Sequence, residues 1–349
     1  MVHGGDIYSN EIEYDFSINL NPVRCPNIVI DELKRSIGDI SHYPDIKQRN
    51  AREILARLEK VMPCNVMAGN GASELIMAAV RMIKPKSAVI IQPSFFGYNH
   101  VINSIENCRI IHYELKEENG FAVTEDFVQF LKATSPELVI VANPNNPTGC
   151  LVSNGLVKEI IYVCESMNTA VLIDECFLGM TEETESVGPM VMQYDNLYVV
   201  KAFTKLFSIP GVRVGYILSS KKNIENIKKY LPEWNLSVFS GNAAGACAKV
   251  LIESDLFRNE TLETIRKERR YLTDSLEKLV DKVYKSDTSF LLLRSDKPLY
   301  ELLLAEKILI RDCSNFEGLG KGFYRIAVKD HDSNKVLIDT LRKVVENGN

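Results

Sequence analysis

Short apolar runs alternate with amphipathic stretches along the chain up to about residue 231. Six of these runs are rich in β-branched residues and predict strands at 88–91, 109–113, 138–142, 170–173, 198–200 and 214–218. Around them, apolar residues at helical spacing predict helices at 49–61, 73–83, 124–132 and 155–165. Most of the strand runs are continuously apolar, so we expect a sheet covered on both faces. The alternation of strand and helix predicts an α/β fold with a mainly parallel sheet.

The pattern changes in the last third of the chain. It predicts a long charged helix, three strand-like runs and a final amphipathic helix, at 256–282, 290–293, 308–311, 324–328 and 335–345. The first forty residues look irregular and contain the polar, extended string SINLNP. We therefore predict three parts. An N-terminal segment, 1–40, packs on the small domain or a partner subunit. It is followed by a large domain, 41–234, and a small α+β domain, 235–349.

Composition and charge narrow the possible partners. Apolar residues make up 46% of the 349 positions, which is enough for a sizeable core, and the formal net charge is −5. One dense basic cluster, 266–270, lies in a Glu-rich helical stretch, so we expect a solvated helix face and no nucleic-acid partner. The eight cysteines form no C-x-x-C pair and the five histidines are dispersed, which indicates a reduced, cytoplasmic protein without a metal site. No apolar run is long enough to cross a membrane.

A lysine stands at the end of one predicted strand. Lys205 follows the apolar run at 197–200, and Arg213 comes just after the turn at Pro210 and Gly211. In mainly parallel sheets, ligands bind outside the carboxyl ends of the strands. An amine nucleophile beside an anion-binding arginine would suit that position. A single lysine in a loop is more simply a surface residue, so this interpretation depends on other groups nearby.

A glycine-containing string at 69–74, GNGASE, opens a predicted helix. Glycines let a ligand approach the backbone, and the free amides of a helix N-terminus attract a phosphate. Glu74 occupies the third glycine position of the G-x-G-x-x-G fingerprint, which counts against a dinucleotide site. An ordinary helix cap would also explain the string.

Two further motifs follow buried strands. The string NPNNPTG at 143–149 makes a rigid turn that would aim an asparagine amide into a cleft. Asp174 ends the apolar run at 170–173. A carboxylate there is costly unless it meets a cation or hydrogen-bond donors, and a protonated pyridine nitrogen would be such a partner. A cap of the next turn is the simpler alternative for Asp174.

Taken together, the motifs match the needs of one cofactor. A ligand with a phosphate, a pyridine nitrogen, a phenolic oxygen and an aldehyde requires an anion cradle, a carboxylate, a hydrogen-bond partner and a lysine. These needs are met in turn by 71–73 with Arg213, by Asp174, by Asn146 and by Lys205. The sequence therefore predicts a site for pyridoxal 5′-phosphate.

The strings NPNNPTG, DECF and FTK…GVRVGY resemble the fold-type I aminotransferases of class I and II, and the likeness covers essentially the whole chain. Within that superfamily the chain is similar to the histidinol-phosphate aminotransferase branch, and most of all to the L-threonine-O-3-phosphate decarboxylases of cobalamin synthesis. That similarity rests on HGG at 3–5, FSINLNP at 16–22, Phe177, and ILIRDCSNFEGL at 308–319 followed by FYRIAV. The resemblance implies a large domain with a mainly parallel sheet and a smaller α+β domain.

The resemblance also implies roles for single residues. Lys205 would bind the cofactor aldehyde, Asp174 the pyridine nitrogen and Asn146 the phenolic oxygen. The ring of Phe95 would stack on the cofactor, and Phe177 would lie near its oxygen. The phosphate would be held by the amides of Gly71, Ala72 and Ser73, with Thr204 and Arg213.

Other implied roles involve the substrate and a partner subunit. Arg325 would bind the substrate carboxylate and Arg311 a substrate phosphate, while His3 and Asn19 would close over the substrate. Tyr43 resembles the tyrosine that reaches the cofactor phosphate of the partner subunit, which implies a homodimer with shared active sites.

Two positions depart from the family pattern. Ala202 stands where a serine or threonine usually helps to hold the phosphate, so we expect Ser73 or Thr204 to compensate in part. Phe177 stands where aminotransferases of the histidinol-phosphate branch usually carry tyrosine, and this departure matches the decarboxylases.

The resulting expectation is a pyridoxal-phosphate enzyme that decarboxylates L-threonine O-3-phosphate. An aminotransferase of the histidinol-phosphate or aromatic type, using 2-oxoglutarate, is the alternative. Two other classes fit less well. A non-catalytic regulator on the same fold usually adds a DNA-binding domain, for which there is no room before residue 41, and a nicotinamide dehydrogenase would need the complete glycine fingerprint.

Overall fold

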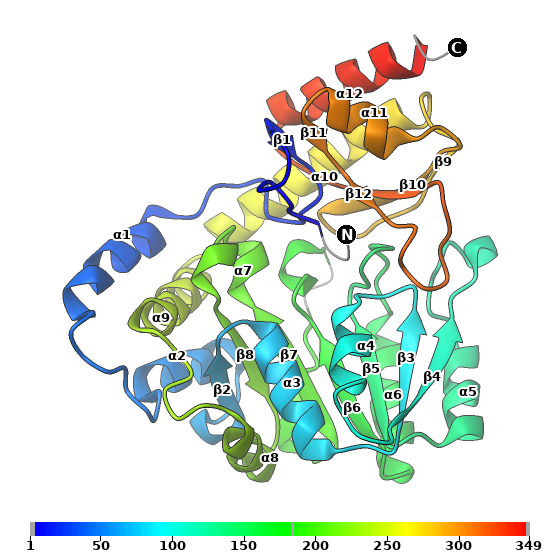
Figure 1. Ribbon diagram of the computed structural model, residues 1–349. Coiled ribbons are helices and arrows are strands. Elements are labelled where there is room, and N and C mark those ends of the chain that lie inside the picture. Colours follow the sequence, from blue (N-terminus) through cyan, green and yellow to red (C-terminus); the bar gives the residue numbers. More distant parts are fainter. Residues whose placement is uncertain (1–3, 183–184, 347–349) are drawn as a thin grey trace.

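The structure is a computed structural model that describes residues 4–182 and 185–346. A seven-stranded sheet forms the centre of its larger part (Figure 1). The order across the sheet is β2 (Val66–Gly69), β8 (Gly215–Leu218), β7 (Leu197–Ala202), β6 (Ala170–Asp174), β5 (Leu138–Ala142), β3 (Ser87–Gln92) and β4 (Arg109–Glu114). All strands run parallel except β8, which is antiparallel to both of its neighbours. The predicted α/β fold with a mainly parallel sheet is confirmed.

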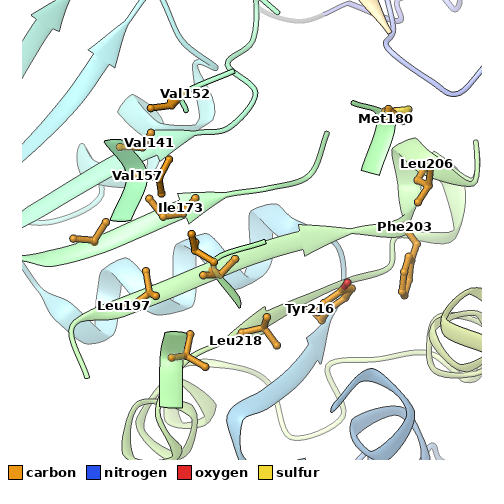
Figure 2. Close-up of a cluster of buried hydrophobic side chains, with 14 of the residues drawn as sticks. Val141, Val152, Val157, Ile173, Met180, Leu197, Phe203, Leu206, Tyr216 and Leu218 are labelled. Atoms are coloured by element: carbon orange, nitrogen blue, oxygen red, sulfur yellow. The ribbon is translucent and has the colours of Figure 1, made fainter. Parts of the chain in front are cut away.

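Alternate side chains of the central strands enter two different cores. On β5, Val139 and Val141 pack on one face of the sheet, while Leu138 and Ile140 pack on the other. Figure 2 shows part of the first core, where Val141 and Ile173 approach Val157 of α6. Because both faces are buried, these strands are apolar at every position.

Helices cover both faces of the large sheet. The helices α3 (Ala72–Ile83), α4 (Gly97–Ile102) and α8 (Lys221–Ile227) contribute to one core. The other core takes side chains from α1 (Asn27–Arg35), α2 (Arg49–Glu59), α5 (Asp126–Thr134), α6 (Asn154–Ser166), α9 (Val238–Glu253) and α10 (Leu256–Leu276). In Figure 1, α1 extends away from the body of the protein, at the left of the view.

A second, smaller group of elements lies beyond the upper edge of the large sheet in Figure 1. Its antiparallel sheet has the order β12 (Arg311–Asp312), β13 (Phe323–Ala327), β10 (Phe290–Arg294) and β9 (Lys282–Val283). The strand β1 (Tyr14–Asp15) pairs in parallel with β11 (Ile308–Leu309). The helices α10, α11 (Leu299–Ala305) and α12 (His331–Glu346) pack with these strands around a third core.

Short helices make up the remaining elements. One is α7 (Phe203–Leu206), and the others are the 3-10 turns η1 (Ser36–Asp39), η2 (Pro63–Asn65), η3 (Glu117–Asn119), η4 (Leu178–Met180), η5 (Gly188–Met192), η6 (Pro210–Val212) and η7 (Lys228–Tyr230). Within the described residues, none of the helices is long and apolar enough to cross a bilayer.

Several sequence-based predictions of elements were wrong. The first forty residues contain the helix α1, and the long helix predicted to reach residue 282 ends at Leu276. The run at 308–311 divides between two sheets, because β11 pairs with β1 while β12 pairs with β13. The domain boundaries at residues 40 and 234 stay predictions.

Candidate active site

The ends of several strands surround one pocket between the large sheet and the smaller part of the fold. Its walls are Gly4, Ser17, Ile18, Asn19, Ala72, Ser73, Ile76, Phe95, Phe96, Tyr98, Ala142, Pro144, Asn146, Asp174, Cys176, Phe177, Ala202, Thr204, Lys205, Arg213, Arg311, Phe316 and Arg325. This is the edge at which ligands bind in open α/β sheets. Twelve of the fifteen residues that the sequence singled out line this pocket; the exceptions are His3, Tyr43 and Gly71.

Lys205 lies in α7, a four-residue helix that begins directly after β7. Burial lowers the pKa of its amine. The positive charges of Arg325 and Arg213 lower the pKa as well, while Asp174 acts in the opposite direction. A lowered pKa raises the fraction of neutral amine at neutral pH, and the neutral form is the nucleophile.

Both carboxylate oxygens of Asp174 accept a hydrogen bond. The hydroxyl of Tyr98 donates to Oδ2 at 2.7 Å, and the backbone N–H of Cys176 donates to Oδ1 at 2.9 Å. Burial, followed by the charge of Asp174, raises the pKa of Tyr98 well above its usual value, so the phenol keeps its proton. A carboxylate can accept about four hydrogen bonds, which leaves capacity for a further donor.

Sequence analysis did not identify Tyr98. It lies in the first turn of α4, 76 positions before Asp174 in the chain. The only signal was its place three residues after Phe95 in the string PSFFGY. The rings of Phe95 and Tyr98 meet edge to face, with centroids 5.6 Å apart.

The N-terminus of α3 and Arg213 form a small cradle. Gly71 caps α3 with a φ of +85°, a conformation that glycine adopts without strain. A Cβ at this position would lie 2.6 Å from Nη2 of Arg213, so the absence of a side chain lets the guanidinium approach the helix amides. Ser73 and Thr204 line the pocket beside them. Amides and a guanidinium at a helix N-terminus suit a phosphate.

Arg325 has a fixed orientation in the pocket. Its Nη1 donates to Oδ1 of Asn146, and its Nη2 donates to the carbonyl of Ser17 at 2.6 Å. Oδ1 of Asn146 accepts from Arg325, while the amide NH₂ of Asn146 makes no hydrogen bond within the described residues and faces the pocket that Asn146 lines. Burial is the main cause that lowers the pKa of Arg325 to about 10.

Two buried polar atoms at the pocket have no partner within the described residues. They are Nε of Arg325 and Oδ1 of Asn19, and both residues are almost completely buried. Buried polar groups are normally hydrogen-bonded. The unpaired donor of Arg325 and the unpaired acceptor of Asn19 could therefore each bind a polar group of a ligand. Together with the cradle at Gly71, they show that the pocket fits a ligand that carries several polar groups.

Arg311 lies beside Arg325, because β12 and β13 pair these two residues directly. Its Nη2 donates to Oδ1 of Asn315 at 2.7 Å, and its guanidinium lies 5.0 Å from the ring centroid of Phe316. Phe177 lies on the same side of the pocket, with its ring 5.2 Å from that of Phe290. The pocket therefore has two neighbouring arginines on the small sheet and a third, Arg213, beside the N-terminus of α3.

The three exceptions have different positions. Gly71 does not line the pocket, but its neighbours Ala72 and Ser73 do. Tyr43 lies outside it, 81% exposed, with its ring 4.9 Å from that of Trp234. His3 lies outside the described residues.

The part of the chain that the structure describes holds no cluster of His, Cys, Asp or Glu placed to bind a metal.

Comparison with known proteins identifies the family of the chain. The sequence model of the family "Aminotransferase class I and II" matches residues 11–341. The threonine-phosphate decarboxylase of Salmonella typhimurium is 29% identical over 358 residues, covering 98% of this chain and 96% of the relative.

Solved structures are also similar. The histidinol-phosphate aminotransferase of Clostridium acetobutylicum is 29% identical and has a TM-score of 0.87, with 96% of this chain and 99% of that chain covered. The fold also matches the histidinol-phosphate aminotransferase of Sinorhizobium meliloti in complex with pyridoxal 5′-phosphate, at 18% identity and a TM-score of 0.86, with 98% and 93% covered.

Proposed function

The chain belongs to the class I and II aminotransferase family, and from this premise we propose that it is a pyridoxal 5′-phosphate enzyme that decarboxylates L-threonine O-3-phosphate. The paired arginines carry the proposal. Arg325 and Arg311 are neighbours on β13 and β12, and guanidinium groups match the geometry of carboxylate and phosphate. A small amino acid with a carboxylate and a phosphate would use both of them. The relative from Salmonella typhimurium, named for threonine phosphate, supports the same substrate.

Residues of the pocket divide into those that would hold the cofactor and those that would hold the substrate. When bound, the cofactor supplies an aldehyde carbon and a ring that accepts electrons from the substrate. Asp174 would hold the protonated pyridine nitrogen, and the NH₂ of Asn146 would donate to the phenolic oxygen. Phe95 would lie against the ring. The amides of α3 and Arg213 would hold the phosphate, with Ser73 and Thr204 in place of the hydroxyl that Ala202 lacks.

Lys205 would act twice. Its neutral amine would first bind the aldehyde carbon, a role favoured by its lowered pKa. The same amine lines the pocket, where it would move a proton at the α-carbon of the substrate. Arg325 would bind the substrate carboxylate through Nε, the atom that has no partner among the described residues.

The choice of reaction would depend on how the pocket orients the α-carbon of the substrate. If its carboxylate is placed to leave, CO₂ would be released; if its hydrogen is placed to be removed by Lys205, the amino group would be transferred. Phe177 supports decarboxylation, because it removes a hydroxyl that the related aminotransferases usually have near the cofactor oxygen. Amino transfer from histidinol phosphate or an aromatic amino acid to 2-oxoglutarate is the second candidate. It is favoured by the similarity to the enzyme of Clostridium acetobutylicum.

Further parts of the proposal concern the whole protein. We propose a homodimer in which Tyr43 reaches the partner's cofactor phosphate, and a cytoplasmic location. We also propose the division into 1–40, 41–234 and 235–349. The pairing of β1 with β11 supports a first segment that packs on the small domain.

The decisive experiment supplies threonine phosphate to the purified protein loaded with pyridoxal 5′-phosphate. Release of CO₂ without formation of glutamate from 2-oxoglutarate is the expected result, and glutamate without CO₂ would overturn the decarboxylase proposal. The Lys205→Ala variant should lose the visible absorbance of the lysine-bound cofactor. Lys221→Ala, which changes an exposed lysine of α8, is the matched control and should keep it.

A further inference from the structure

The N-terminal segment 17–21 runs from Arg325 to the helix that carries Lys205. At one end, the carbonyl of Ser17 accepts a hydrogen bond from Nη2 of Arg325 at 2.6 Å. At the other end, the backbone N–H of Asn21 donates to the carbonyl of Lys205 at 3.0 Å. Between them, Asn19 lines the pocket. None of the roles given above involves Asn21.

Asn21 uses every one of its polar groups. Its Nδ2 donates to the carbonyl of Leu206 at 2.7 Å and to Oγ1 of Thr261 at 2.8 Å. Its carbonyl accepts from the hydroxyl of Ser208 at 2.7 Å, and its Oδ1 accepts from the backbone N–H of Val23 at 2.9 Å. The residue is only 6% exposed. A buried asparagine with all groups paired is a specific junction between the N-terminal segment, α7 and α10.

The helix α7 depends on contacts of this kind. It has only four residues, Phe203–Leu206, and so completes a single turn. A helix this short is unfavourable by itself, and the last carbonyls of any helix lack partners within it. Asn21 supplies donors to two of these carbonyls. Its backbone N–H donates to that of Lys205, which also accepts from the N–H of Ser208 at 3.2 Å, and its Nδ2 donates to that of Leu206. The backbone of the lysine is therefore held from outside the helix.

We propose that Asn21 is a positioning residue that fixes Lys205 by closing the C-terminal end of α7. The same short segment holds Arg325 through Ser17, so it sets the distance between the amine and the substrate-binding guanidinium. The inference rests on the proposed role of Lys205. The position of the Lys205 amine would thus depend on a residue 184 positions away in the chain (205 − 21).

The test compares two variants that disrupt the junction to different extents. Asn21→Ala removes three side-chain hydrogen bonds, including the one to Leu206, and keeps the backbone bond to Lys205. Thr261→Val removes only the anchor on α10 and leaves both bonds to α7. We expect Asn21→Ala to capture pyridoxal 5′-phosphate at least about 10-fold more slowly, because a misplacement of about 1 Å can cost on the order of 100-fold. The pH midpoint of the visible band should shift too. Thr261→Val should keep the wild-type capture rate and midpoint, even if its melting temperature falls.

The outcomes separate positioning from general stability. If both variants lower the melting temperature while Asn21→Ala keeps the wild-type capture rate and pH midpoint, the inference is overturned. If Asn21→Ala does not fold, Asn21→Ser provides the same comparison with a side chain too short to reach Leu206. Persistence of the visible band in Lys205→Ala would instead overturn the proposed function, and this inference with it.

Discussion

Asp174 owes its orientation to two donors from distant parts of the chain. Tyr98 comes from α4, and the N–H of Cys176 comes from the turn after β6. The phenol holds one oxygen at 2.7 Å and thereby fixes the plane of the carboxylate. A partner for a pyridine nitrogen must present an oxygen in that plane, so the hydroxyl of Tyr98 should contribute to cofactor affinity.

The Tyr98→Phe variant tests this contribution. Loss of one hydrogen bond of about 0.5–1.5 kcal/mol predicts a dissociation constant for pyridoxal 5′-phosphate about 2- to 12-fold higher, measured by titration of the apo-protein. Tyr113→Phe is the matched control. Tyr113 also donates to a carboxylate at 2.7 Å, that of Asp126, but the pair lies outside the pocket. Equal affinities for both variants would show that Tyr98 does not act through Asp174.

Among single residues, sequence analysis assigned roles to those that stand in unusual strings. It missed residues whose hydrogen-bond partners are distant in the chain. Lys205, Asp174 and Asn146 follow apolar runs at the ends of strands, and the structure brings them to one pocket. Tyr98 has no such local signal, and Asn21 was given no role although it stands in the string FSINLNP. Their partners come from other elements, and only the folded chain makes them neighbours.

A buried ionic cluster joins several elements behind the active site. Lys201 of β7 lies 2.8 Å from Glu59 of α2 and 3.4 Å from Glu175, the residue after Asp174. The hydroxyl of Tyr216 on β8 donates to Glu59 at 2.6 Å. Burial opposes the charge of Lys201, but the two glutamates raise its pKa overall. For Glu175 the burial dominates and raises the pKa, against the effect of Lys201.

We expect Lys201→Met to destabilise the protein by about 3–5 kcal/mol, because it leaves two buried carboxylates without a cation. Urea unfolding at neutral pH measures the effect. The control is Lys158→Met, which breaks an exposed pair with Glu185 at 2.7 Å and should cost about 0–1 kcal/mol. A similar loss in both variants would contradict a special role for the buried cluster.

The hydrophobic pattern of the sequence predicted some strands correctly and missed others. Continuous apolar runs found the central strands, since both faces of the sheet are buried and each run has the length of a strand. The edge strand β2 was missed, because its string VMAG is short and leads into a glycine turn. The division of 308–311 was missed for another reason. Ile310 interrupts the pairing, and no local pattern tells that β11 and β12 join different sheets.

At the scale of the whole molecule, several exposed apolar side chains follow α1 in the chain. Ile37, Ile40 and Tyr43 are 59–81% exposed, and Trp234, which contacts Tyr43, is 46% exposed. Apolar patches of this kind often mark interfaces. Because the proposed homodimer would place Tyr43 in the partner's site, a second copy of the chain is the expected occupant.

Sedimentation analysis should therefore find a dimer of the wild-type protein. Ile40→Asp should shift it toward the monomer and weaken binding of pyridoxal 5′-phosphate, since the proposed contact from Tyr43 is lost. Ile46→Asp changes another apolar residue of the region, which is 36% exposed, and should have a smaller effect. A wild-type monomer that binds the cofactor tightly would contradict the shared site.

The two parts of the fold meet through a cluster at Glu117. This residue lies in η3 after β4, while its partners belong to β9, β10 and the chain between them. Its Oε1 accepts from Tyr284 at 2.6 Å and from Lys282 at 3.3 Å, and Arg294 lies 3.6 Å from Oε2. The hydroxyl of Tyr284, followed by these cations, lowers the pKa of Glu117 below 4.5, although burial opposes the shift.

The direction of this pKa shift predicts how the stability of the protein changes at acid pH. A carboxylate whose pKa is lower in the folded state stabilises the protein above the unfolded value of 4.5, and this stabilisation is lost as the pH falls through the folded value. Glu117→Gln should therefore be less stable than wild type at neutral pH, by up to about 1 kcal/mol for a half-exposed group. The two proteins should become equally stable in acid. Urea midpoints measured from neutral pH downward test this, with the exposed neighbour variant Glu118→Gln as the control. A difference that does not change with pH would mean that the cluster joins the two parts through packing, without the charge of Glu117.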